Sequence, residues 1–220
     1  MPTSPASTPP PPSDDLRERA AAVLGGPLST SQVRQLETFE ELLLGRGSEL
    51  GVISKRDAGR VRERHVLDCL RAAVPVQPSD RSAYDLGSGG GLPGLVVAIV
   101  APRLQVTCVE ARRNRVAFLE LAIDRLGLPN AHAWQGRIEG LEAPVDLCFA
   151  RALADPATSW RLAQPLLLPE GRLIYFAGKG FRAPPPDREG GRQGSHALRM
   201  TLLHAVGLES AGPVVIMGRP

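Results

Sequence analysis

The stretch YDLGSGGGLPG at residues 84–94 is rich in glycine and is the first candidate for chemistry in this chain. Glycine adopts positive φ without steric cost, and its bare backbone lets a ligand approach closely. A turn of this kind, between a strand of a parallel sheet and the following helix, is where nucleotide-like ligands bind. The pattern G-x-G-x-x-G is made by Gly89, Gly91 and Gly94, and its neighbours must decide which ligand it serves.

Two acidic residues accompany these glycines. Asp85 precedes Gly87 by two positions, and Glu110 ends the apolar run LQVTCVE at residues 104–110. An acid about 20 residues after such glycines commonly accepts hydrogen bonds from ribose hydroxyls. We therefore predict that Glu110 binds a ribose; the alternative is that it is a solvated strand end.

Two kinds of cofactor fit such a turn. A dinucleotide such as NAD places its pyrophosphate on the helix N-terminus. S-adenosylmethionine has no phosphate, and its charged amino-acid end needs carboxylate and backbone partners, of which Asp85 is one. The chain after the expected fifth strand is too short for a separate substrate domain. These features favour S-adenosylmethionine, with an NAD-dependent oxidoreductase as the alternative.

A sheet of parallel strands must hold this turn. From Arg81 onward, short β-prone runs alternate with helical segments, which predicts βαβ units. The fold class is therefore α/β, with a Rossmann-type sheet and helices on both faces. The expected strands are 82–87, 104–110, 131–136, 145–151, 171–178 and 213–218, and the expected helices are about 94–101, 113–126, 157–167 and 196–206. A long loop is expected at 178–196.

The first third of the chain has a different pattern. Residues 1–13 are rich in proline and serine and are predicted to be a disordered tail. Residues 14–79 are predicted to be an N-terminal helical region, with an amphipathic helix at 31–44 capped by Ser31 and a second helix at 58–74. Residues 80–220 are the predicted methyltransferase domain.

Composition limits the compartment and the partners. The chain has 220 residues and a net charge of +3; its basic residues are almost all arginine, which suits phosphate recognition, although a GC-rich coding sequence explains it more simply. The longest apolar run, 95–101, is too short for a membrane span, which needs about 20 residues. The three cysteines lack metal-ligand spacing and suit reduced thiols. We expect a cytoplasmic monomer without a metal.

Taken in order, the motifs resemble a known family. DLGSGGGLPG, VTCVEARRNRVAFLE, GRIE, ARAL and GKG look like the motifs of the glucose-inhibited division protein B family, and RHVLDC at residues 64–69 is similar to its Arg-His-x-x-Asp-Ser helix. The family consists of bacterial methyltransferases that modify N7 of a guanine in small-subunit (16S) ribosomal RNA. The resemblance implies S-adenosylmethionine as methyl donor and small-subunit ribosomal RNA, or the ribosomal subunit, as partner.

The resemblance also implies roles for individual residues. Cofactor binding is expected of Asp85, Gly87, Gly89, Leu92, Glu110, Ile138, Glu139 and Arg151, with Ile138 and Glu139 flanking the adenine. RNA binding is expected of Arg64, His65, Arg137 and Lys179. The catalytic candidates are Arg151, Arg137 and His65. The chain departs from the family at Gly90, where alanine is common, and at Cys69, where serine is usual.

Methylation of guanine N7 makes limited demands on side chains. The N7 lone pair lies in the ring plane and carries no proton, so catalysis can come mainly from positioning. An arginine on N7 itself would block methylation, so Arg137 and Arg151 are assigned to phosphate, O6 or orientation. The alternatives are strand-end salt bridges for the arginines and a structural hydrogen bond to Asp68 for His65. An RNA-binding protein of methyltransferase fold without transfer activity is a further alternative.

Overall fold

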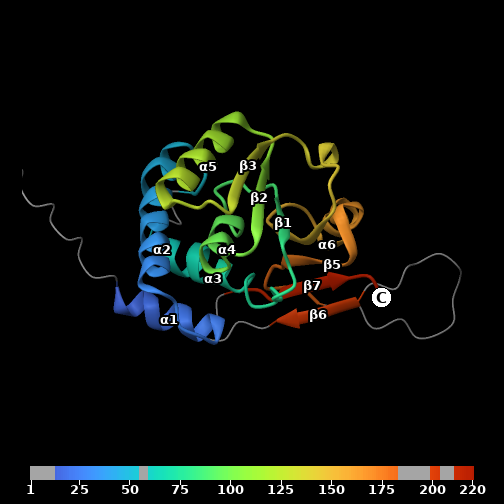
Figure 1. Ribbon diagram of the computed structural model, residues 1–220, viewed down its shortest axis with the longest axis horizontal. Helices are drawn as coiled ribbons and strands as arrows, with labels where there is room; N and C mark the ends of the chain where they lie inside the picture. Colours follow the sequence, from blue (N-terminus) through green and yellow to red (C-terminus); the bar gives the residue numbers. More distant parts are fainter. Residues whose placement is uncertain (1–12, 55–58, 183–198, 204–210) are drawn as a thin grey trace, which may run out of the picture.

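A seven-stranded sheet forms the centre of the computed structural model, which describes residues 13–54, 59–182, 199–203 and 211–220 (Figure 1). The strands are β1 Ser82–Leu86, β2 Gln105–Glu110, β3 Ala131–Gln135, β4 Val145–Arg151, β5 Leu167–Phe176, β6 Arg199–Leu203 and β7 Val214–Gly218. Their order is β3-β2-β1-β4-β5-β7-β6. The first five strands run parallel, whereas β7 is antiparallel to both of its neighbours. The order reverses at β1, which has β2 on one side and β4 on the other, so a ligand site is expected at its carboxyl end.

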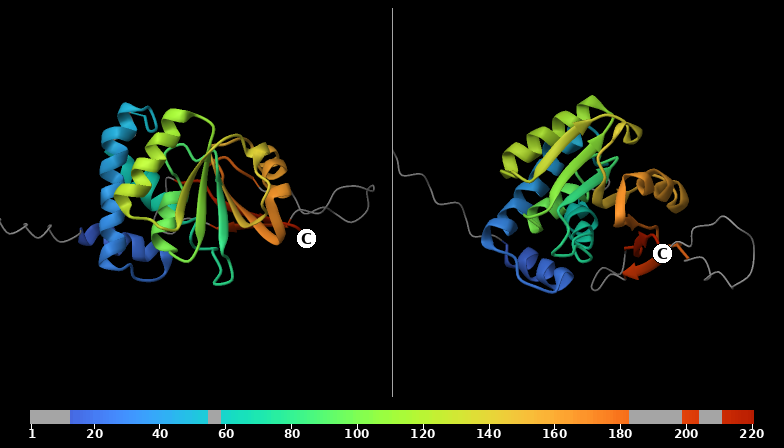
Figure 2. Two further views of the ribbon diagram at one scale, coloured as in Figure 1. Left: turned by 45° about the horizontal axis from the view of Figure 1, so that its top comes forward. Right: turned by 45° about the vertical axis from the view of Figure 1, so that its right-hand side comes forward.

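Helices cover both faces of this sheet (Figure 2). On one face lie α1 Asp14–Leu24, α2 Thr30–Leu42, α3 Asp68–Leu70, α4 Gly94–Val100 and α5 Arg113–Leu126, and on the other lies α6 Pro156–Ala163. Side chains alternate accordingly along β1, since Ala83 belongs to the first apolar cluster while Tyr84 and Leu86 belong to the second. The predicted α/β class and Rossmann-type sheet are confirmed.

The helices of the N-terminal region pack directly against the sheet layer. Leu16, Val33 and Phe39 belong to the same buried cluster as Leu95 of α4 and Phe118 of α5. After α2 the chain continues in a π-helical turn, Leu43–Gly47, and a second π-helical turn, Arg62–Leu67, leads into α3. The helix expected at 58–74 is shorter in the structure: within the described residues it ends with α3 at Leu70, and turns follow at 71–75.

One predicted boundary and one predicted element in the second half of the chain are wrong. The helix expected at 157–167 ends at Ala163; a short 3₁₀ turn, Gln164–Leu166, follows, and β5 already begins at Leu167. The helix expected at 196–206 is contradicted by β6, whose residues pair antiparallel with β7. Met200 and Leu202 of β6 pack on the second cluster, an alternation that suits a strand on one face of the sheet.

Other expectations fall outside the described residues. These are the predicted tail, of which only Ser13 is described, and most of the loop expected at 178–196. Among the described helices, none combines the length and the apolar character that crossing a membrane requires.

The cap of α2 also differs from the prediction. Ser29, not Ser31, is its N-cap: Ser29 Oγ accepts a hydrogen bond from the Gln32 amide at 3.2 Å, and Gln32 Oε1 accepts one from the Ser29 amide at 2.9 Å. This reciprocal capping box satisfies two backbone donors that the helix itself leaves unpaired.

We predict that Ser29→Ala lowers the free energy of unfolding by about 1 kcal/mol, because it removes the acceptor at the N-cap. Ser31→Ala is the comparison: Ser31 is also exposed, and its Oγ lies 2.9 Å from Ser29 Oγ, but its loss leaves the Gln32 amide with its acceptor, so the effect should be smaller. Urea denaturation of both variants measures the difference. A larger loss for Ser31→Ala than for Ser29→Ala would contradict the assigned cap.

Candidate active site

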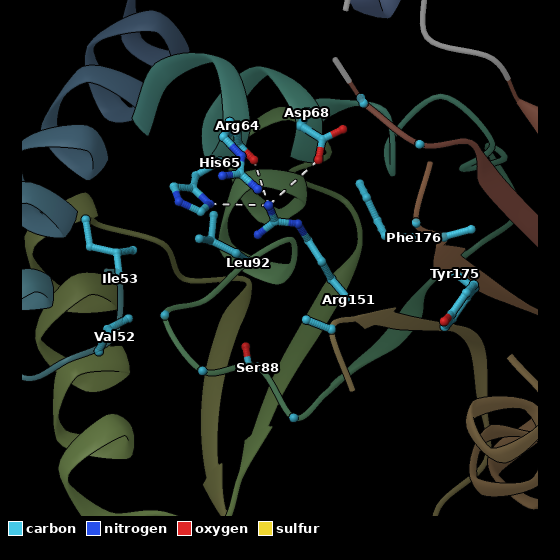
Figure 3. A pocket seen from close by; sticks show the side chains of 18 of the residues that line it. Val52, Ile53, Arg64, His65, Asp68, Ser88, Leu92, Arg151, Tyr175 and Phe176 are labelled. Carbon is cyan, nitrogen blue, oxygen red and sulfur yellow. Dashed lines mark hydrogen bonds and ion pairs between the residues drawn. The ribbon is translucent and has the colours of Figure 1, made fainter. Parts of the chain in front are cut away.

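A cavity of about 840 Å³ lies at the carboxyl ends of β1, β4 and β5 (Figure 3). Its walls come from the segment before α3, the glycine turn after β1, the start of α5, and the ends of β4 and β5. The lining residues include Val52, Ile53, Arg64, His65, Asp68, Gly87, Ser88, Gly89, Gly90, Leu92, Arg115, Arg151, Tyr175, Phe176 and Lys179. The cavity therefore brings together predicted cofactor-binding residues from the turn and predicted RNA-binding residues from two distant segments.

The glycine turn presents bare backbone to this cavity. Gly89 has a φ of 58°, and a Cβ added there would make only ordinary van der Waals contacts, the nearest at 3.8 Å from Arg115 Nη1. Gly94 begins α4 and has the opposite surroundings, because a Cβ there would lie 2.7 Å from Asp85 Oδ2. One glycine thus leaves room for a ligand, and the other leaves room for the carboxylate that holds the turn.

Asp85 lies beneath the turn and is not among the residues that line the cavity. Its side chain is 1% exposed, and Oδ2 accepts hydrogen bonds from the Gly94 amide at 3.0 Å and from Ser88 Oγ. Burial raises the pKa of Asp85 to about 6, against the opposing effect of these two donors. Because this pKa exceeds the value of 3.8 for an exposed carboxyl, ionising Asp85 costs stability as the pH rises from about 4 to 6.

Glu110 ends β2 beside the turn and is 6% exposed. Its Oε2 accepts a hydrogen bond from the Gly89 amide at 3.1 Å, and its Oε1 accepts one from the Arg112 amide at 2.9 Å. Arg115 Nη1 lies 3.6 Å from Oε2. The carboxylate is thus held against the glycine turn and is not a solvated strand end; like Asp85, Glu110 is not among the residues that line the cavity.

The predicted adenine-flanking residues lie beyond Glu110, outside the 840 Å³ cavity. The segment is tied to Glu110 by a hydrogen bond of 3.0 Å from the Gly136 amide to the Glu110 carbonyl. Ile138 begins a 3₁₀ turn and packs, half-buried, on the second apolar cluster, while Arg137 and Glu139 are exposed. Arg137 is therefore not brought into the cavity with the other catalytic candidates.

Arg151, at the end of β4, reaches across the cavity to the segment before α3 (Figure 3). Its Nη2 donates to the Arg64 carbonyl at 2.6 Å and lies 3.3 Å from His65 Nδ1 and 3.7 Å from Asp68 Oδ2. A guanidinium can only donate, so Nδ1 of His65 accepts and carries no proton in this arrangement. On its other side, Arg151 Cζ lies 5.9 Å from the centre of the Phe176 ring.

Two alternatives were raised for this cluster, a strand-end salt bridge for Arg151 and a structural hydrogen bond to Asp68 for His65. Arg151 does form a salt bridge at a strand end, but with a residue that lines the cavity. The Asp68 carboxylate, in turn, binds the guanidinium groups of Arg71 and Arg151. Arg151, His65 and Asp68 therefore form one cluster in the wall of the cavity that the glycine turn also lines.

Several lining residues were not predicted from the sequence. Phe176 and Tyr175 end a predicted strand, and that position at the carboxyl edge of a parallel sheet was the available signal. Val52 and Ile53 had no local signal, since they reach the turn only through tertiary packing. Within the described residues, no group of three or more metal-ligating side chains is present.

A model of the rRNA small subunit methyltransferase G family, GidB, matches residues 32–183. The chain belongs to this family. One relative, ribosomal RNA small subunit methyltransferase G of Acidiphilium cryptum, is 39% identical over 174 residues, covering 78% of each protein. The protein of the same name from Ralstonia nicotianae is 38% identical over 182 residues, covering 78% of this chain and 79% of its own length.

The solved structures agree at the level of the fold. A methyltransferase from Geobacter sulfurreducens has a TM-score of 0.53 at 16% identity, covering 84% of this chain and 88% of its own. The predicted family and the predicted class of enzyme, a methyltransferase, are thereby confirmed. The family also decides between the two cofactors considered, in favour of the methyl donor.

We predict that Gly94→Ala weakens binding of S-adenosylhomocysteine at least about tenfold and lowers the free energy of unfolding by about 1–3 kcal/mol, because the new methyl displaces the Asp85 carboxylate. Gly45→Ala is the control, since a Cβ at Gly45 meets nothing within 4 Å. Calorimetric titration and thermal unfolding measure the two effects. Unchanged affinity in Gly94→Ala would show that the turn tolerates the displacement.

Proposed function

We propose that this chain transfers the methyl group of S-adenosylmethionine to N7 of a guanine in the RNA of the small ribosomal subunit, and that it does so as a cytoplasmic monomer. The observation that supports this most strongly is the composition of the cavity. The open glycine turn forms one wall, and Arg64, His65, Arg151 and Lys179 lie around it. A site for a nucleoside-like donor thus adjoins basic residues suited to an RNA acceptor.

The residues around the turn fit the donor. Gly87, Gly89 and Leu92 would contact it through the side of the turn that lines the cavity, where an added Cβ at Gly89 would make only ordinary van der Waals contacts. The carboxylate of Glu110 would accept from its ribose, and Ile138 and Glu139 would flank its adenine. Asp85 would supply the negative charge for its amino-acid end from beneath the turn. When bound, S-adenosylmethionine supplies an electrophilic methyl group on a positively charged sulfur.

The acceptor side of the cavity works by positioning. Since N7 has no proton to lose, no residue has to remove one. Arg151 is held by the Arg64 carbonyl, His65 and Asp68, so its guanidinium is fixed before any substrate arrives. We assign it to orienting the guanine at the junction with the donor. This geometry lowers the entropic cost of in-line attack.

The remaining basic residues suit the RNA backbone. Arg64 and Lys179 are exposed at the cavity, and Arg137 is exposed on the adjoining segment after β3. We assign these three side chains to phosphate contacts, and His65 to the nucleotide next to Arg151. Loss of a phosphate contact should weaken RNA binding and its salt dependence without changing donor affinity.

The test of the function is transfer of a labelled methyl group from S-adenosylmethionine to small ribosomal subunits that lack the modification, followed by identification of the labelled nucleoside. Label in 7-methylguanosine of the small-subunit RNA is the expected result. Label in another nucleoside would keep the enzyme class and overturn the acceptor. Bound donor with no label on subunits or naked RNA would favour the alternative of an RNA-binding protein without transfer activity.

Donor binding should depend on the charge of Asp85. The pKa of about 6 means that the carboxyl is mostly neutral below pH 6 and mostly charged above it. We predict that affinity for S-adenosylhomocysteine rises about tenfold between pH 5 and 7, because the charged form attracts the ammonium group. In Asp85→Asn the affinity should stay low and lose this inflection.

The matched control is Asp146→Asn, since Asp146 accepts hydrogen bonds from the Arg81 and Ser82 amides at the start of β1, at the opposite end of the strand from the turn. Its pH profile should follow that of the unaltered protein. Calorimetric titration across the pH range measures all three proteins. An inflection that persists in Asp85→Asn would remove Asp85 from donor binding.

A further inference from the structure

Arg71, just after α3, is a buried cation that no part of the predicted site includes. It is 4% exposed, and its Nη1 donates to Asp68 Oδ1 at 2.7 Å. Its Nη2 donates to the carbonyl of Leu203 in β6 at 3.2 Å. Burying a guanidinium is costly unless it is paired. These two contacts hold Arg71 in one orientation, although its buried Nε has no hydrogen-bond partner among the described residues.

The carboxylate that Arg71 binds is shared with the active site. Asp68 Oδ1 is taken by Arg71, and Asp68 Oδ2 lies 3.7 Å from Arg151 Nη2. Asp68 and Arg151 line the cavity, whereas Arg71 does not. A continuous series of contacts therefore runs from the edge strand β6 through Arg71 and Asp68 to Arg151.

This series of contacts constrains the orientation of the Arg151 guanidinium. Because Arg71 holds Oδ1 closely, Asp68 presents its other oxygen to Arg151 at the longer distance. Arg151 can then keep its short hydrogen bond to the Arg64 carbonyl and its approach to His65 Nδ1. Without Arg71, the carboxylate is free to turn and form a close pair with Arg151, which would draw the guanidinium away from those two acceptors.

We propose that Arg71 is a positioning residue that acts through Asp68 to set the orientation of the Arg151 guanidinium. The proposal rests on the function proposed above, in which Arg151 orients the target guanine. Arg71 itself touches neither the donor nor the RNA. Its loss should therefore lower turnover while leaving donor affinity unchanged.

Arg172 provides a matched control. It is also a largely buried arginine, with Nη2 2.6 Å from Asp80 Oδ2 and 3.5 Å from the Pro75 carbonyl. It therefore makes the same kinds of contact, one to a carboxylate and one to a carbonyl, but it does not line the cavity and its carboxylate does not reach Arg151. Truncating either arginine should lower the melting temperature, and only the Arg71 truncation should alter the site.

The experiment compares Arg71→Met and Arg172→Met in methyl transfer to small ribosomal subunits, at a temperature where both variants are folded. We expect Arg71→Met to lower kcat about tenfold to a hundredfold, with affinity for S-adenosylhomocysteine within about twofold of the unaltered protein. Arg172→Met should retain kcat. Arg71→Lys, which keeps the charge and one of the two contacts, should fall between them and serves in place of Arg71→Met if that variant does not fold.

Asp68→Asn tests whether the effect passes through Asp68. If it does, adding Arg71→Met to Asp68→Asn should cause little further loss of kcat, because the coupled residues are not additive. Fully additive losses, or equal losses of kcat in Arg71→Met and Arg172→Met, would overturn the proposal.

A second measurement does not depend on methyl transfer. The nitrogen resonances of the His65 ring report the approach of Arg151 Nη2 to Nδ1, and they are identified by comparison with His65→Gln. We expect them to shift in Arg71→Met and not in Arg172→Met. That result in a protein without transfer activity would keep the positioning role and overturn the proposed function, whereas unchanged resonances in an active protein would overturn the positioning role alone.

Discussion

The active site depends on the hydrogen bonds that the buried carboxylate of Asp85 accepts. The carboxylate ties the first residue of α4 to the end of β1 through the Gly94 amide, and it ties Ser88 into the same turn. Both ties need a residue without a side chain at position 94, since a Cβ there would overlap the carboxylate. The conformation of the turn depends on this side chain together with Glu110, whose Oε2 accepts a hydrogen bond from the Gly89 amide. The raised pKa of Asp85 is the cost of placing a carboxyl at that position.

The N-terminal region supplies walls of the cavity that the sheet does not provide. Val52 packs so closely on the turn that a Cβ at Gly90 would lie 2.3 Å from Val52 Cγ1. Farther along, the π-helical turn Arg62–Leu67 supplies Arg64 and His65 to the opposite wall, and the first residue of α3 supplies Asp68. The glycine at position 90 thus has a local reason in this chain, because it accommodates Val52. The turn and the N-terminal region must therefore be considered as one site.

The sequence predicted those features that depend on local pattern. Strands β1, β2 and β4 are short β-prone runs whose residues are mostly buried, as expected for strands covered on both faces. The acids Asp85 and Glu110 lie near the ends of β1 and β2, where the pattern placed them. The segment that became β6 was expected to be helical because a short apolar run does not by itself distinguish helix from strand. Pairing with β7, distant in the chain, decides it. The contacts of Val52 and Arg71 could not be predicted from local pattern either, because both join segments that are far apart in the sequence.

The charges around the cavity suit a reaction in which the reactants already carry a positive charge. Transfer to N7 moves that charge from sulfur to the purine and creates no new one, so the cavity does not need an added cation near the reacting atoms. An unpaired Arg151 would repel both the donor and the methylated product. Its pairing with Asp68 offsets that charge, while the Phe176 ring lies close enough to present a π face to a cation. In the role proposed for Arg151, the contacts that fix its guanidinium would therefore also limit its repulsion of the donor.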